Sequence, residues 1–194
     1  MRLMPVNNTG PPARVTDADV YWMLRALEDD NRLGRKRLSE IMDLGEGSTR
    51  RALDILRDCG FVEIYQTGIV ISQSGREFLE SIPIVPVQIE VPGSVIGEFQ
   101  ESVLVKGASE MVRNGQSQRD AGIKIGSLGC TTIVYRDGAL MIPPDWNLDE
   151  KSPKEAEMIR KVKEFTPDDV VIIGGADNLR LAMNAAVSAA LELI

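Results

Sequence analysis

Residues 35–74 have the sequence RKRLSEIMDLGEGSTRRALDILRDCGFVEIYQTGIVISQS, and this stretch decides the fold of the first part of the chain. Its apolar residues recur at helical spacing in two segments, which predicts one helix over residues 35–43 and a second over residues 49–58. Between them, the glycines of Gly45-Glu46-Gly47 favour a turn with positive φ. Ser48 is expected to cap the second helix at its N-terminus, and Gly60 to end it.

A β-hairpin is expected to follow the second helix. Residues 61–65 and 69–71 are rich in β-branched and aromatic side chains, and Thr67-Gly68 lies between them at the expected tip. One further helix is predicted to begin at Thr16, and another to start at Ser74 and pack against it. The order helix, turn, helix, hairpin is that of a winged helix-turn-helix, which we expect to span residues 16–82.

Basic side chains concentrate in this predicted winged helix. In winged helices that recognise nucleic acid, the first turn of the second helix approaches the duplex, and Arg50 and Arg51 are expected there. The preceding helix then contacts phosphates. The predicted DNA-binding residues are Arg35, Lys36, Arg37, Ser48, Thr49, Arg50 and Arg51, with Arg32 and Arg57 as neighbouring basic residues.

Other interpretations of the same residues stay open. Asp43, Glu46, Asp54 and Asp58 lie among the arginines and balance their charge, as they would on an ordinary solvated face. Winged helices also serve as protein-interaction modules, and contact with RNA is a further alternative.

The overall charge restricts how the chain can bind DNA. The 194 residues carry a formal net charge of −7. Residues 1–82 hold 11 Lys and Arg against 13 Asp and Glu, a net −2, which leaves −5 for the remainder. Such a chain is not a non-specific nucleic-acid coat protein, so DNA binding is expected to come from a local basic surface.

Composition also restricts the chemistry. The chain has no histidine, which excludes histidine-based triads and most catalytic zinc sites. Cys59 and Cys130 are expected to be reduced thiols in apolar surroundings, since two distant cysteines make neither a disulfide framework nor a zinc site. We therefore expect a protein that is not an enzyme, with no catalytic residues, no metal and no cofactor.

The N-terminal segment is expected to be a flexible tail over residues 1–15, because it is rich in Pro, Asn and Gly and has no periodicity. Its Arg2 and Arg14 are candidates for a DNA-contacting arm. The segment has no apolar core of the kind found in secretion signals, and no apolar run reaches the ~20 residues of a membrane helix. A cytoplasmic protein without membrane contact is expected.

A second domain is expected over residues 83–194, after the proline-containing stretch SIPIVPVQIEVP of residues 81–92. Its Val87, Ile89 and Val91 alternate as in a strand. The expected elements are strands at 101–106, 131–135, 139–142 and 168–173 and helices at 117–125, from Ser152-Pro153 and over 178–193. Asp137-Gly138 predicts a hairpin, and Glu155 a capping box with Ser152. The fold class is therefore α+β.

Two places in the second domain are candidates for a site. Arg119, Asp120 and Lys124 on one helix, with Thr131 and Thr132 on the next strand, predict a small-molecule or anion pocket; the alternative is an Arg–Asp network that pins the helix to the sheet. The other is Gly174-Gly175-Ala176-Asp177 before the last helix. It lacks the Lys and Ser/Thr of a phosphate-binding loop, and Asp177 would repel phosphate, so a structural turn with Asp177 as helix cap is favoured.

Several residues carry a resemblance to known proteins. The segments Cys59–Glu63 and Ser74–Leu79 are similar to those of many prokaryotic winged-helix regulators. Together with the wing region, residues 115–143 resemble an uncharacterised archaeal two-domain family. The residues that carry this resemblance are Gln118, Arg119, Asp120, Ala121, Ile123, Lys124, Gly126, Gly129, Thr131, Thr132, Tyr135, Asp137, Gly138 and Pro143.

The resemblance implies an N-terminal winged helix and a C-terminal α+β sandwich similar in fold to the insertion domain of bacterial aspartyl-tRNA synthetases. The family has no assigned activity. With the basic residues above, we expect a transcriptional regulator that binds double-stranded DNA, forms a homodimer and responds to a small-molecule effector. The alternatives are a winged helix that mediates protein or RNA contacts, with a second domain that binds a small ligand or is an enzyme using Arg119, Asp120 and Lys124.

Overall fold

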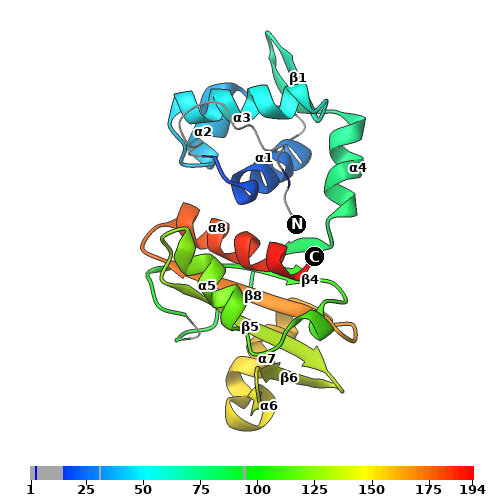
Figure 1. Cartoon of the computed structure of the whole chain (residues 1–194), viewed down its shortest axis with the longest axis vertical. Coiled ribbons are helices and arrows are strands. Elements are labelled where there is room, and N and C mark those ends of the chain that lie inside the picture. The colour runs from blue at the N-terminus through cyan, green and yellow to red at the C-terminus, as the bar shows by residue number, and fades with distance from the viewer. Residues whose placement is uncertain (1–2, 4–14, 31, 94) are drawn as a thin grey trace. The chain divides into compact units, whose positions relative to one another are not determined.

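The computed structural model describes residues 3, 15–30, 32–93 and 95–194. The chain divides into two compact units, of which the first ends at Ile82 and the second spans Pro83–Ile194 (Figure 1). Most of the predicted tail, including Arg2 and Arg14, lies outside the described residues, but Val15 at its end is buried. None of the helices within the described ranges is long and apolar enough to span a membrane.

The first unit has the expected order of elements. Its helices are α1 (Asp17–Asp29), α2 (Arg35–Ile41), α3 (Glu46–Asp58) and α4 (Gln73–Ser81), and its hairpin strands are β1 (Val62–Tyr65) and β2 (Gly68–Ile71). Thr16 caps α1 through a capping box, in which its Oγ1 accepts the N–H of Asp19 and the carboxylate of Asp19 accepts the N–H of Thr16. The predicted packing of α4 on α1 is confirmed.

The turn between α2 and α3 differs from the prediction. Its positive φ belongs to Asp43 (φ 45°), whereas Gly45 has φ −62° and is itself the N-cap of α3. Ser48 is therefore inside the helix rather than at its cap. The structural reason is that the chain already turns at residues 43–44, where the N–H of Leu44 bonds to the carbonyl of Ser39 and the Ser39 hydroxyl donates to the carbonyl of Leu44.

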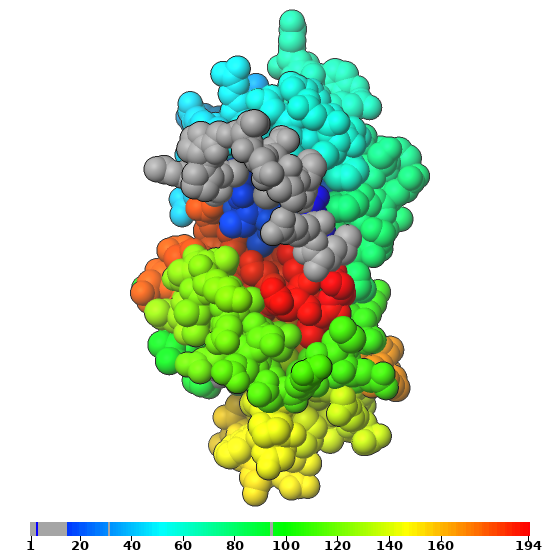
Figure 2. Space-filling model, in the orientation of Figure 1, coloured from blue at the N-terminus to red at the C-terminus, as the bar shows by residue number. Residues whose placement is uncertain are grey.

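The wing is a β-hairpin with a two-residue turn, and a single bridge adds a short third segment to it. Tyr65 pairs with Gly68, so Gln66-Thr67 forms the tip, one residue earlier than predicted. Leu33, just before α2, exchanges two backbone hydrogen bonds with Ile69, of 3.0 and 2.7 Å. The hairpin projects from the surface of this unit (Figure 2), and the Leu33 pairing fixes its base next to the start of α2.

The second unit is built on one antiparallel sheet with strand order β3-β4-β8-β5-β6-β7. The strands are β3 (Ile84–Val87), β4 (Phe99–Val105), β5 (Gly129–Arg136), β6 (Ala139–Ile142), β7 (Trp146–Asn147) and β8 (Val170–Ala176). The α-helices are α5 (Gln116–Lys124), α6 (Leu148–Lys151), α7 (Pro153–Val162) and α8 (Leu179–Ala190). Short 3₁₀ turns lie at Ser109–Met111 and Leu191–Leu193.

Alternation along the strands gives this sheet two covered faces. Val171 and Ile173 of β8 belong to an apolar core that includes Ala156 and Ile159 of α7. The intervening residues of β8 face the opposite side, where α8 and α5 pack on the sheet and on each other (Figure 1). The mixed fold class predicted from the sequence is confirmed.

Gly174 and Gly175 have a different role from the predicted one. Both lie in β8 and are buried, so they do not form the turn into the last helix, whose cap is Asn178 rather than Asp177. A Cβ atom on Gly174 would lie 2.4 Å from the carbonyl oxygen of Ala182 and 2.7 Å from the amide nitrogen of Ala186. Glycine here permits the backbone of α8 to approach the sheet closely.

Local turn chemistry was predicted correctly in the β5–β6 hairpin and only in part at α7. Asp137 and Gly138 have φ of 53° and 81°, as a two-residue hairpin of this type requires. Pro153 is in the first turn of α7, but the Ser152 side chain makes no capping bond, so the capping box is wrong. Ser152 also ends α6, where its N–H bonds to the carbonyl of Leu148, and this fixes its backbone away from capping geometry.

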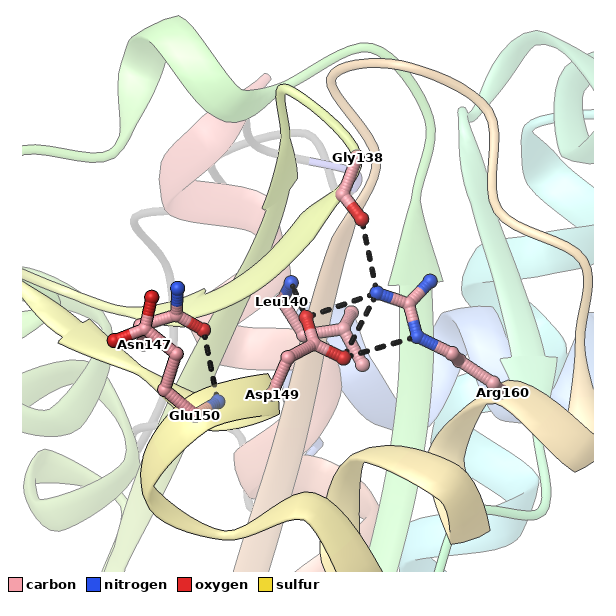
Figure 3. A network of polar contacts seen from close by, with 6 residues as sticks. All are labelled: Gly138, Leu140, Asn147, Asp149, Glu150 and Arg160. Atoms are coloured by element: carbon pink, nitrogen blue, oxygen red, sulfur yellow. Dashed lines mark hydrogen bonds and ion pairs between the residues drawn. The ribbon is translucent and has the colours of Figure 1, made fainter.

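An ion pair holds α6 and α7 to the β5–β6 hairpin (Figure 3). Nη2 of Arg160 donates to the Asp149 carboxylate (2.9 Å) and to the carbonyl of Gly138 (3.0 Å), while the same carboxylate accepts the N–H of Leu140 (2.8 Å). Partial burial acts to raise the pKa of Asp149, but the hydrogen bonds from Arg160 and Leu140 outweigh it and hold that pKa below its ordinary value of 3.8.

Asp149→Asn is expected to lower stability in a pH-dependent way. Because the folded-state pKa is depressed, the ionised carboxylate stabilises the fold above pH 3.8, and this contribution is lost as pH falls through the folded-state pKa. At neutral pH we expect a loss of about 1 kcal/mol, since the pair is only partly buried. Urea unfolding at several pH values measures it; a wild-type advantage that stays constant into acid would contradict this account.

Candidate nucleic-acid interface

Helix α3 presents one apolar and one basic face. Thr49, Ala52, Leu53 and Leu56 follow the i, i+3, i+4, i+7 spacing and are buried. Thr49 is fully buried and its hydroxyl donates to the carbonyl of Gly45 (3.3 Å), so its predicted DNA contact is wrong. Ser48 is partly buried, whereas Arg50 and Arg51 are exposed.

A hollow of about 420 Å³ lies between α2, α3 and the wing strand β1, and we call it the basic groove. The residues that line it are Arg35, Arg50, Leu53, Asp54, Arg57 and Ile64. It brings together Arg35 and Arg50 from the predicted set. Arg51 lies about 100° further round α3 than Arg50, because an α-helix has 3.6 residues per turn.

The cations of this surface differ in how they are engaged. Arg57 forms ion pairs with Asp54 (3.1 Å) and Asp58 (2.9 Å), and Arg37 pairs with Glu40 (3.4 Å). Within the described part of the chain, Arg35, Arg50 and Arg51 have no such partner, and neither has Lys36. These exposed cations are available to phosphate groups without first breaking an ion pair.

The wing adds a basic residue that the predicted set omitted. Arg32 stacks on the ring of Tyr65, 5.5 Å from its centre, and donates a hydrogen bond to the hydroxyl of Thr67. Its position depends on the pairing of Leu33 with Ile69, a single bridge too short to recognise as a strand in the sequence. The charge of Arg32 is thereby fixed beside the wing tip.

Only some of the residues predicted for the site in the second unit lie together. A pocket of about 440 Å³, which we call the Arg119 pocket, is lined by Arg119, Thr131 and Thr132 from the predicted set. Asp120 and Lys124 are exposed and do not line it, because they lie about 100° and 140° round α5 from Arg119. Among the described residues Arg119 has no ion pair, so the predicted Arg–Asp network is not formed.

Cys130 also lines the Arg119 pocket. Burial raises the pKa of Cys130 to about 12, so its thiol stays protonated at neutral pH. The thiol lies 3.4 Å from the carbonyl oxygen of Ala185 in α8, which makes it part of the packing between the sheet and that helix.

The two units are thus an N-terminal winged helix that carries the basic groove and a C-terminal domain built on one sheet. Residues 18–85 match the family model described as the CggR N-terminal DNA binding domain. Residues 96–193, half of the chain, match the domain of unknown function DUF4443. The chain belongs to the DUF4443 family.

A solved structure is similar over both units. It is the hypothetical protein PH0730 from Pyrococcus horikoshii OT3, with 26% sequence identity, a TM-score of 0.74 and coverage of 93% of each chain. The comparison with curated proteins finds no match. The two-domain architecture is thus confirmed, while the likeness to the synthetase insertion domain stays a prediction.

Proposed function

We propose that the chain is a transcriptional regulator of the winged-helix type that binds double-stranded DNA, with a second unit that dimerises and binds a small-molecule effector. The match of residues 18–85 to a DNA-binding domain supports the first part. The observation that carries the proposal is the basic groove, where Arg35 of α2 and Arg50 of α3 converge beside the wing.

The geometry suggests how a duplex would be held. Helix α3 would enter the major groove with Arg50 and Arg51 toward base edges or phosphates, because its opposite face is buried. Arg35, Lys36 and Arg37 at the start of α2 would contact phosphates. Arg32 at the wing would approach the backbone or the adjacent minor groove.

Dimerisation would compensate for the acidic character of the chain. The net charge of −7 opposes DNA binding at long range, so one unit with a few unpaired cations would bind weakly. Two copies on adjacent half-sites would double the phosphate contacts. An effector could control binding only if its affinity differed between two arrangements of the dimer.

Selection from a pool of random duplexes tests this proposal. The expected result is an enriched inverted repeat whose half-sites lie about one helical turn, or a multiple of it, apart. Sedimentation equilibrium of the selected complex is expected to give two chains per duplex. Enrichment of no sequence would contradict regulation at specific sites, and one chain per duplex would contradict the dimer.

A further inference from the structure

The Arg119 pocket lies where strand β6 separates from β5. The two strands pair from Arg136–Ala139 to Val134–Met141, and the same register would next join Ile133 to Ile142 and then Thr132 to Pro143. Proline has no N–H to donate, so the ladder ends there. The preceding residues of β5 pair with β8 on one side, and no described strand pairs with them on the other. The pocket occupies that open edge.

The walls of the pocket contain donors of hydrogen bonds and no acid. Asn114, Gly115 and Gln116 supply the start of α5, where the positive end of the helix dipole lies. Arg119 supplies a guanidinium, which has no ion-pair partner in the described ranges. The chain contains 29 Asp and Glu residues, and among the residues that the structure describes no Asp or Glu lines the pocket.

Thr132 provides an independent indication of a ligand. Its side chain is 4% exposed and lines the pocket, and its Oγ1 has no hydrogen-bond partner among the described residues. The side chain lies beside the start of α5, since a Cβ atom on Gly115 would lie 3.6 Å from both the Cβ and the Oγ1 of Thr132. A buried hydroxyl without a partner is costly, which a bound acceptor would correct.

The position of Arg119 is also determined by its neighbours. Its Cγ would lie 3.7 Å from a Cβ atom on Gly129, so the stem of the side chain runs over the bare backbone at the start of β5. Ile142, Pro143 and Pro144 also line the pocket and are apolar. The lining of the pocket thus combines a cation and hydrogen-bond donors with apolar surface.

We propose that this pocket binds a small organic molecule through an oxyanion group, a carboxylate or a phosphate, with Arg119 as the cation and the Thr132 hydroxyl as a buried donor. The body of the ligand packs on Ile142, Pro143 and Pro144. The inference depends on the proposed regulator function only for the role of the ligand as effector. Binding itself is a property of the second unit and can be measured without DNA.

The test is a titration of the ¹⁵N-labelled full chain with inorganic phosphate and, separately, with acetate. Amide shifts of Gly115, Gln116 and Thr132 are expected to change saturably with at least one probe, and the effective probe identifies the anion class. Arg119→Gln is expected to weaken that binding about tenfold or more, since it removes a charged hydrogen bond. Lys124→Gln removes the same charge from α5 outside the pocket and is expected to leave affinity unchanged.

Thr132→Val separates binding from stability. It is expected to weaken binding several-fold but to leave the melting temperature of the ligand-free chain equal or higher, because it removes an unsatisfied buried hydroxyl. Absence of saturable shifts with both probes would overturn the proposal, as would equal affinity in the Arg119→Gln and Lys124→Gln variants. Failure of DNA binding in a separate assay would leave these results unaffected and would count only against the regulator.

Discussion

Simultaneous replacement of Arg50 and Arg51 by alanine is expected to reduce affinity for duplex DNA by roughly 100-fold or more, because each contact to a base edge or phosphate contributes about 1–3 kcal/mol. Both side chains are exposed on α3 and lie outside its buried row of residues. If both contact phosphates, the slope of log affinity against log salt should fall by about 2. Fluorescence anisotropy with a labelled duplex measures both quantities.

Two controls make this result specific. Lys154→Ala with Lys163→Ala removes two exposed positive charges from the second unit, and it is expected to change affinity little. Thr49→Val alters the same helix at a fully buried position, so binding per folded molecule should be retained. If the lysine pair weakened binding as much as the arginine pair, overall charge rather than α3 would explain the affinity.

Gly174→Ala is expected to destabilise the second unit by about 3 kcal/mol or more, at the upper end of the cost of overpacking. The added Cβ would meet backbone atoms of α8 at 2.4 Å and 2.7 Å, and backbone cannot move aside as a flexible side chain does. The helix would have to shift away from β8 and lose contact between its buried alanines and the sheet. Urea unfolding of the full chain measures this loss.

The position of the clash gives the matched controls for Gly174→Ala. In the Gly174→Ala background, Ala185→Gly removes the nearest side-chain atom to the new Cβ (3.0 Å) but leaves both backbone contacts, so it should not restore stability. Gly47→Ala in α3 has nothing within 4 Å and is expected to be neutral or stabilising by up to about 1 kcal/mol. A Gly174→Ala variant as stable as wild type would contradict the close approach of α8 to the sheet.

Local signals account for the parts of the fold that were predicted well. The helix start at Thr16 and the hairpin at Asp137-Gly138 depend on a few neighbouring residues, whose backbone preferences are visible in the sequence. Glycine is more ambiguous. Gly174 and Gly175 have the composition of a turn. Gly174 is instead required by the contact with α8, and Gly175 by the close approach of Val95 and Ile96, which only the tertiary structure reveals.

In the candidate sites, too, some features follow from local sequence and others only from tertiary contacts. The burial of Thr49 could have been predicted from the sequence, because Thr49 is the first residue of an i, i+3, i+4, i+7 pattern with Ala52, Leu53 and Leu56. Helical phase also separates Asp120 and Lys124 from Arg119. By contrast, Arg119 and Thr132 line one pocket because Pro143 ends the β5–β6 ladder, and this depends on the tertiary structure.

The most direct test of the central claim is the binding of duplex DNA by the wild-type chain over a salt series, followed by fluorescence anisotropy. We predict measurable binding at low ionic strength, with an association constant whose logarithm falls linearly with the logarithm of salt concentration. No salt-sensitive binding at low ionic strength, or a clear preference for structured RNA over duplex DNA in competition, would contradict it.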